Sequence, residues 1–296
     1  WFWKKKAQSR LSLPPKTAEA FAPAKINLTL HVTGQREDGY HLLDSLVVFV
    51  DVGDRIFVAS DTENSLTVTG PFSEGVPTDG SNLVMTAKAR FIPDQAVALR
   101  LDKHLPPASG IGGGSSDAAA TLRALSKAFD RPLPAPDQVT RLGADVPVCL
   151  HARPTRMRGI GDRLDDVDGL PPLHMVLVNP KVEVPTPQVF KALSSKTNRS
   201  MPGDLPEWKD TFGFAEWLKT QRNDLEMPAR SIAPAIGVVL SRIAATEGCL
   251  LARMSGSGAT CFGLYASRTE ADWAAHDIRE VFPDWWVAAA SEWALR

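Results

Sequence analysis

Leu105–Asp117 reads LPPASGIGGGSSD, and it runs directly into Ala118–Leu122, which reads AAATL. Four of the five residues from 110 to 114 are glycine, so this backbone is unobstructed and has access to positive φ. The alanine-rich segment that follows predicts the start of a helix. A loop that enters a helix N-terminus directs several N–H groups and the positive end of the helix dipole at one point, which favours phosphate. The stretch therefore predicts a phosphate-binding loop, with an ordinary glycine-rich turn as the alternative.

Neither of the two familiar phosphate-loop patterns fits this stretch. The P-loop requires a lysine after its last glycine, and Ser115 stands there instead. The dinucleotide fingerprint begins at Gly110 and Gly112 but also has Ser115 where its third glycine belongs. Ser115 and Ser116 instead place two hydroxyls at the start of the predicted helix. Such hydroxyls suit helix capping, phosphate oxygens or a Mg²⁺ ion.

The composition is that of an ordinary globular enzyme. The chain has 296 residues, which favours two domains, with 44% hydrophobic and 23% charged residues. The formal net charge is −1, and no basic stripe with interleaved aromatic residues is present. The charge pattern therefore argues against a nucleic-acid partner.

The cysteines and the apolar segments bear on the cellular compartment. The three cysteines, Cys149, Cys249 and Cys261, lie far apart without C-x-x-C spacing. This pattern predicts a reducing, cytoplasmic compartment and argues against a disulfide framework or a zinc cluster. No apolar stretch approaches the roughly 18 residues that a membrane span needs. Residues 1–3 (WFW) do not resemble a signal peptide, and the lysines at 4–6 are expected to be solvated in a flexible tail over residues 1–20.

The remaining pattern predicts an α+β protein. Strands are expected at 25–32, 46–50, 55–58, 66–69 and 97–101, with a helix over 82–90 and a loop entering a strand over 142–150. An acidic, Gly/Pro-bearing stretch at 165–172 is the best candidate for a linker. Beyond it we expect a strand at 175–178, helices near 214–220 and 232–246, a hairpin over 253–265, and a helix over 270–281 before a Trp-rich strand. This order fits an α+β sandwich.

Two segments before the glycine stretch carry unusual polar residues. Lys25 and Asn27, in Pro23–Asn27, share one face of a predicted strand, so both can reach one ligand. The alternative is a solvated strand face. Tyr40 and His41 stand in a glycine-turned loop and suit stacking on, or hydrogen bonding to, a planar base. A loop with a packed aromatic side chain explains them equally well.

Two segments after the glycine stretch add further candidates. Asp145 lies in Gly143–Pro147, just before a Val-Pro step, so we expect it to be positioned rather than mobile. It suits a base toward a hydroxyl or a partner for a lysine, and a structural turn aspartate is the alternative. Met254–Phe262 is a second loop of small residues, which lets a ligand approach its backbone closely but is a weak signal by itself.

Together these segments resemble the GHMP small-molecule kinases, in order from about Ala22 to the C-terminus. The motifs that carry the resemblance are Pro23–Leu28, Asp38–His41, Gly110–Asp117, Gly143–Pro147 and Met254–Cys261, with further fits at Asn179–Pro180, Pro185–Phe190 and Asn223–Glu226. The Pro-Ala-Lys-Ile-Asn and Asp-Gly-Tyr-His motifs are far more specific than a glycine loop. The resemblance implies a two-domain α+β fold with a ribosomal-protein-like N-terminal domain over 21–168, which carries the ATP phosphate loop, and a ferredoxin-like C-terminal domain over 169–296.

The resemblance also implies a reaction and the residues that perform it. It is strongest to the branch that uses ATP to phosphorylate the 2-hydroxyl of a cytidine diphosphate derivative of methylerythritol, in non-mevalonate isoprenoid biosynthesis. Lys25 and Asp145 are then the catalytic pair, and whether Asp145 is a full base or an electrostatic anchor stays open. ATP is expected on Pro106, Pro107, Ala108, Ser109, Gly110, Ile111, Gly112, Gly113, Gly114, Ser115 and Ser116, with Asn82 near the adenine and Mg²⁺ on the phosphates near Ser115 or Ser116. The substrate is expected on Asn27, Tyr40, His41, Thr186 and Phe190, with the aromatic residues around cytosine.

Three alternatives are weaker. Another GHMP kinase, acting on mevalonate, homoserine or a sugar, is disfavoured by Asp38–His41. A non-catalytic ligand-binding protein is disfavoured because Lys25 and Asp145 are both present, and a nucleic-acid module by the near-neutral charge. The segments 88–97 and 129–142 are shorter than the helices usual in the family, which concerns the nucleotide side only. We expect a monomer or a weak homodimer.

Overall fold

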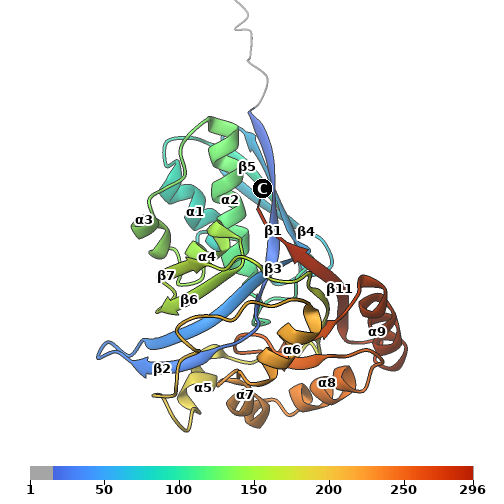
Figure 1. The fold of residues 1–296 in the computed structure, drawn as a ribbon. Helices are drawn as coiled ribbons and strands as arrows, with labels where there is room; N and C mark the ends of the chain where they lie inside the picture. Colours follow the sequence, from blue (N-terminus) through green and yellow to red (C-terminus); the bar gives the residue numbers. More distant parts are fainter. Residues whose placement is uncertain (1–15, 296) are drawn as a thin grey trace, which may run out of the picture.

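The computed structural model describes residues 16–295 and has two halves that share one sheet (Figure 1). The predicted α+β class is confirmed. The expectations for residues 1–3 and 4–6 lie outside the described residues. The predicted tail over 1–20 lies partly outside them, and the structure differs from it at residues 17–20, which form a strand and pair with residues 56–59.

The strand that connects most of the sheet is β3, His41–Ser60, which spans 20 residues. It is antiparallel to all five strands that pair with it, β1, β2, β5, β6 and β11. The prediction of two separate short strands at 46–50 and 55–58 is wrong. Both segments belong to β3, because β1 pairs with β3 before and after residues 51 and 52 and so keeps it extended. A bulge between Pro23 and Ala24 absorbs the mismatch in register.

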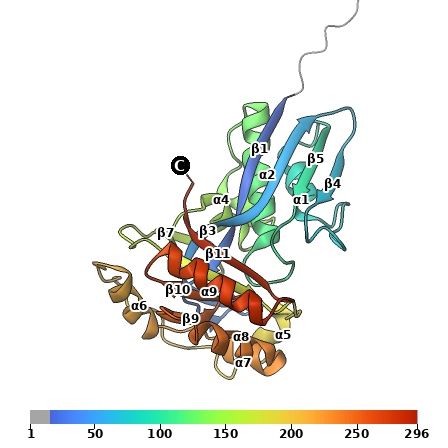
Figure 2. The same cartoon turned by 90° about the vertical axis from the view of Figure 1, so that its right-hand side faces the viewer.

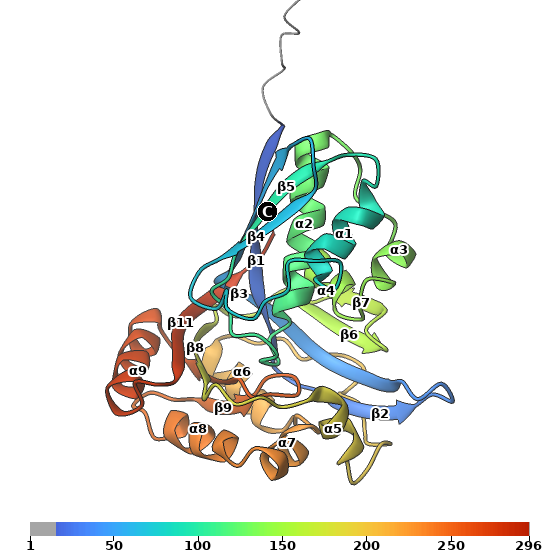
Figure 3. The same cartoon turned by 180° about the vertical axis from the view of Figure 1, so that it is seen from behind.

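The first half packs helices against one face of this sheet (Figure 3). Its other strands are β1 (Thr17–Asn27), β2 (His31–Gln35), β4 (Ser65–Thr69), β5 (Val97–Asp102), β6 (Thr155–Gly159) and β7 (Arg163–Asp166). Its helices are α1 (Leu83–Phe91), α2 (Gly113–Phe129), α3 (Pro136–Thr140) and α4 (Val146–His151). The apolar side of α2, including Ala118 and Leu122, packs with Val47 and Phe49 of β3. This burial places the start of α2, and the glycine loop before it, at the edge of the first half.

The second half is a four-stranded antiparallel sheet covered by helices (Figure 2). It contains β8 (His174–Asn179), α5 (Thr186–Lys191), α6 (Thr211–Lys219), α7 (Glu226–Ile232), α8 (Ala235–Ala244), β9 (Leu251–Met254), β10 (Cys261–Tyr265), α9 (Arg268–Val281) and β11 (Trp286–Trp293). The strand order β11-β8-β10-β9 is that of a ferredoxin-like sandwich. α9 begins with a capping box between Ser267 and Glu270, which satisfies the N–H groups at its start.

The strand β11 belongs to both halves. Its residues 286–291 pair with β8, and Glu292 and Trp293 pair with Val50 and Phe49 of β3. The last strand therefore returns across the predicted domain boundary at 168/169 and closes the two sheets into one. Among residues 16–295, no helix combines the length and the apolar character that crossing a bilayer requires.

Two local predictions fail near the functional motifs. The strand expected over 25–32 is interrupted at residues 28–30, where Leu28 and Thr29 both donate to the carbonyl of Leu46. The strand expected within 142–150 is instead α4, because Pro147 occupies the first turn of a helix, where its missing N–H costs nothing. The hairpin predicted over 253–265 is confirmed by the pairing of β9 with β10.

Candidate active site

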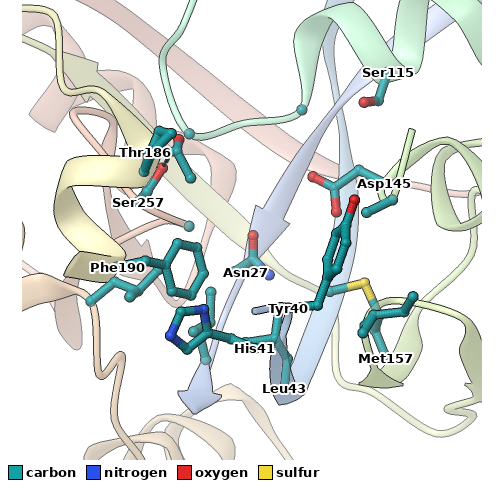
Figure 4. Close-up of a pocket in the computed structure, with 18 of the residues that line it drawn as sticks. Asn27, Tyr40, His41, Leu43, Ser115, Asp145, Met157, Thr186, Phe190 and Ser257 are labelled. Carbon is teal, nitrogen blue, oxygen red and sulfur yellow. Dashed lines mark hydrogen bonds between the residues drawn. The ribbon is translucent and has the colours of Figure 1, made fainter. Parts of the chain in front are cut away.

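A cavity of about 1000 Å³ lies where the glycine loop, β1 and the second half of the chain meet. All five motifs contribute to its lining. Among the lining residues are Lys25, Asn27, Tyr40, His41, Gly110, Gly112, Gly113, Gly114, Ser115, Asp145, Thr186, Phe190, Gly256 and Ser257. Figure 4 shows Ser115 and Asp145 on one side of this cavity and Thr186, Ser257, Phe190 and His41 on the other.

The lysine and the aspartate form an ion pair at the cavity wall. Lys25 Nζ lies 2.8 Å from Asp145 Oδ2, and the two side chains are 5% and 36% exposed. Asp145 precedes the first residue of α4, but its carboxylate does not cap that helix. The lysine therefore holds one carboxylate oxygen, and the partly exposed carboxylate can still receive a proton from a bound molecule.

The glycine loop lies directly against Lys25. The backbone N–H of Lys25 donates to the carbonyl of Ile111 at 3.0 Å. Gly112 has φ +66° and precedes the first residue of α2. A Cβ at Gly112 would lie 3.2 Å from both Cβ and Cε of Lys25. The glycine thus leaves room for the lysine to extend past the start of α2 to Asp145.

The second small-residue loop, Met254–Phe262, packs directly against the glycine loop. Gly110 has φ +76°, and a Cβ there would lie 2.7 Å from the backbone N and O of Gly258 and from the carbonyl oxygen of Ser255. The Ser255 hydroxyl donates to the carbonyl of Gly110 at 3.2 Å and accepts from the N–H of Asn27 at 3.0 Å. The two loops and β1 are therefore in close backbone contact.

Replacing Gly110 with alanine is expected to lower the free energy of unfolding by about 2–4 kcal/mol, because the new methyl group meets three backbone atoms and the backbone φ is positive. The matched control is Gly114→Ala in the first turn of α2, where a Cβ meets only Leu83 Cδ1 at 3.9 Å. That control is expected to be neutral or to stabilise by about 0.5–1 kcal/mol. Urea unfolding of the nucleotide-free proteins compares the two, and equal stabilities would contradict the packing argument.

The side of the cavity opposite Asp145 carries aromatic and hydroxyl groups (Figure 4). The rings of His41 and Phe190 stack with centroids 4.5 Å apart and an interplanar angle of 23°. Burial lowers the pKa of His41, and the charge of Lys196 lowers it further, so the imidazole is neutral near pH 7. The hydroxyls of Thr186 and Ser257 lie 2.7 Å apart. Tyr40 is 58% exposed.

Asn27, which lines the same cavity, has a side-chain oxygen that accepts no hydrogen bond from the described residues. Its amide nitrogen donates to Ser45 Oγ at 2.8 Å, and the side chain is almost fully buried. Its Oδ1 has no hydrogen-bond partner among the described residues. A buried acceptor without a donor is costly, so this oxygen fits a donor on a bound molecule.

Some of the predicted nucleotide residues do not line the cavity. Ser116 is fully buried and donates to the carbonyl of Pro23 at 2.7 Å, so its hydroxyl is committed to the fold. Ile111 is also fully buried, and Pro106 and Pro107 precede the lining residues Ala108 and Ser109. Asn82 lies outside the cavity lining as well. It accepts from the N–H of Val84 at 2.9 Å and caps α1, so its role near adenine stays a prediction.

The sequence reasoning missed two groups of residues. Lys191 and Lys196 line the cavity near Phe190, and within residues 16–295 neither lies within ion-pair distance of a carboxylate. The signal for Lys191 was its position directly after Phe190. A buried cluster of Asp54, Lys103 and Asp117 beneath the glycine loop was missed too. Nothing in the sequence pattern links these three residues.

Comparison with known proteins identifies the family. Residues 82–162 match the GHMP kinases N terminal domain, and residues 210–284 match the GHMP kinases C terminal domain. A curated relative from Dinoroseobacter shibae, 4-diphosphocytidyl-2-C-methyl-D-erythritol kinase, is 59% identical over 268 residues, which are 90% of this chain and 92% of the relative. This chain belongs to the 4-diphosphocytidyl-2-C-methyl-D-erythritol kinase family of the GHMP kinases.

Two further proteins agree with the family assignment. A kinase of the same name from Cereibacter sphaeroides (strain ATCC 17025 / ATH 2.4.3) is 55% identical over 273 residues, covering 92% of this GHMP kinase and 98% of the relative. A crystal structure of 4-(cytidine 5'-diphospho)-2C-methyl-D-erythritol kinase superimposes with a TM-score of 0.74 at 32% identity, covering 93% of this chain and 98% of that one. The predicted GHMP kinase fold is confirmed.

Proposed function

We propose that this GHMP kinase transfers the γ-phosphoryl group of ATP to the 2-hydroxyl of 4-diphosphocytidyl-2-C-methyl-D-erythritol, giving the 2-phosphate and ADP. The observation that carries the proposal is the Lys25–Asp145 ion pair, which lines the same cavity as the glycine loop and the His41–Phe190 stack. The names of relatives at 55% and 59% identity support the choice of substrate.

The chemistry follows from the positions of these groups. Phosphoryl transfer needs alignment and neutralisation of charge more than covalent help. In our proposal the N–H groups of the glycine loop hold the phosphates. Asp145 orients the attacking hydroxyl and receives its proton, and Lys25 offsets negative charge on the attacking oxygen and the transferred group. Asn27, Tyr40, His41, Thr186 and Phe190 hold the substrate, with the aromatic rings beside cytosine.

A magnesium ion fits this site only as a partner of the ATP phosphates. Within residues 16–295, no three His, Cys, Asp or Glu side chains form a cluster suited to a metal. Mg²⁺ needs few protein ligands when phosphates and water supply the rest. Ser115 lines the cavity and would hold it, whereas the hydroxyl of Ser116 is committed to Pro23. When bound, the ion would neutralise charge on the phosphate oxygens.

A coupled assay of ADP release tests the proposal directly. The purified protein is offered ATP with the cytidylated methylerythritol, mevalonate or homoserine in parallel. We expect turnover with the cytidylated substrate alone, with formation of the 2-phosphate checked by phosphorus NMR. Turnover of mevalonate but not of the cytidylated substrate would overturn the assignment.

We also propose a cytoplasmic enzyme that is a monomer or weak homodimer and does not bind nucleic acid. Cys149, Cys249 and Cys261 are all free thiols, and Cys149 and Cys261 are buried. Burial raises the pKa of Cys149 to about 12, which keeps this thiol protonated and unreactive. Free thiols of this kind suit a reducing compartment.

A further inference from the structure

A buried cluster of three charged side chains lies beneath the glycine loop and outside the cavity lining. Lys103 Nζ lies 2.5 Å from Asp54 Oδ2 and 2.8 Å from Asp117 Oδ2. The three side chains are between 0% and 5% exposed. Asp54 belongs to β3, Lys103 follows β5, and Asp117 lies in α2. The cluster therefore joins three elements of the first half.

The cluster holds the chain on both sides of the glycine loop. In the segment before the loop, the N–H groups of His104 and Leu105 donate to Asp54 Oδ1 at 2.5 Å and 2.8 Å. In the segment after the loop, Asp117, 14 positions beyond Lys103, accepts a hydrogen bond from the Lys103 ammonium. A Cβ at Gly113 would lie 3.2 Å from Lys103 Nζ, so the ammonium lies against the first residue of α2.

Burial and mutual contact shift the pKa values of Asp117 and Lys103. Burial raises the pKa of Asp117 to about 8, against the opposing effect of Lys103. Burial disfavours the charged form of Lys103, but the two carboxylates more than offset this and raise its pKa above the ordinary value. Lys103 is thus charged and is held between two carboxyl groups.

We propose that Asp54, Lys103 and Asp117 are positioning residues that fix the two ends of the glycine loop and so preorganise its N–H groups for the phosphates of ATP. A run of glycines has more conformational freedom to lose on ordering than any other sequence. The cluster restrains that freedom before the ligand arrives, and small misplacements of binding groups are costly. The identity of the ligand rests on the proposed function, whereas the restraint on the loop does not.

Two substitutions at Asp117 test this directly. Asp117→Leu has a similar volume but no acceptor for Lys103, so the link to α2 is lost while the Lys103–Asp54 bond remains. Asp117→Asn keeps a neutral oxygen that accepts this bond. For Asp117→Leu we expect affinity for a non-hydrolysable ATP analogue, measured by calorimetry, to fall about tenfold. The KM for ATP should rise in parallel, the KM for the alcohol substrate should stay unchanged, and Asp117→Asn should remain within about threefold of the wild type.

A second pair of variants covers the case in which Asp117→Leu does not fold. Lys103→Met removes both bonds of the ammonium but keeps an unbranched chain of similar length. Its matched control is Lys88→Met in α1, because Lys88 is also buried, at 2% exposure, and makes no ion pair among the described residues. We expect Lys103→Met to weaken nucleotide binding and Lys88→Met to leave it unchanged, whatever each does to the melting temperature.

Amide hydrogen exchange in the nucleotide-free protein separates this inference from the proposed function. We expect faster exchange at Gly112–Ser115 in Asp117→Leu and Lys103→Met than in the wild type and Lys88→Met. Unchanged exchange and unchanged analogue affinity in the folded variants would overturn the positioning role and leave the cluster purely structural. A wild-type protein without affinity for nucleotide would overturn the proposed function. Amide exchange at Gly112–Ser115 would still show whether the cluster restrains the loop.

Discussion

Asp145→Asn is expected to lower kcat by roughly 10²- to 10⁴-fold, the range that general acid–base catalysis contributes. The amide has almost the same shape as the carboxylate, so the start of α4 should be retained. It cannot accept the proton of the attacking hydroxyl, and it carries no charge to pair with Lys25. We expect affinity for ATP to be nearly unchanged, because the glycine loop supplies the phosphate contacts. Steady-state kinetics and calorimetry with an ATP analogue measure the two quantities separately.

Asp94→Asn is the control, because Asp94 is exposed and is not among the residues that line the cavity. We expect it to behave as the wild type in kcat and in both KM values. Near-wild-type turnover of Asp145→Asn would refute the role of Asp145.

Lys25→Met is expected to lower kcat by roughly 10²- to 10³-fold, as loss of one donor to a developing oxyanion does in other enzymes. Methionine matches the length of the lysine stem, and its side chain can follow the same route past Gly112. The substitution leaves Asp145 without its partner, but this carboxylate is 36% exposed and water can solvate it. The protein should therefore fold, and circular dichroism together with analogue binding checks this point.

The double variant Lys25→Met/Asp145→Asn gives the sharper result. Residues that act as one unit show strongly non-additive effects, so the double variant should be about as slow as the slower single variant. Multiplying losses would indicate that the two residues act independently and would contradict the paired mechanism. Lys25→Arg is expected to retain little activity, because the lysine stem passes so close to Gly112 that a Cβ added there would lie 3.2 Å from it, which leaves little room for the wider guanidinium.

The sequence was a good guide where local periodicity decides the geometry. Lys25 and Asn27 were expected on one strand face, and both line the cavity because alternate residues of a strand point to the same side. The start of α2 after Gly112 was predicted from the glycines and alanines. Asp145 was singled out as a positioned residue, and it lines the cavity, but it was expected before a strand, and a helix with Pro147 in its first turn begins there instead.

The remaining features depend on contacts between distant parts of the chain. Lys103 and Asp54 are 49 positions apart, so no motif of either segment reveals their ion pair. The commitment of Ser116 to the carbonyl of Pro23 is likewise a contact over 93 positions. A hydroxyl next to a glycine loop looks the same in sequence whether it faces a ligand or the core. Only the packing of α2 against β1 separates Ser115 from Ser116.

The double membership of β11 has a consequence for the order in which the protein is built. Val50 and Phe49 of β3 gain their partners Glu292 and Trp293 only after the ribosome has added more than 240 further residues. The Ser255–Gly110 contact, over 145 positions, is late for the same reason. The first half therefore leaves the ribosome with a free strand edge and a glycine loop that lacks its contact with Ser255. Nascent chains of this kinase should become competent to bind nucleotide in one late step, and stalled chains that end before β11 should depend on chaperones that shield strand edges.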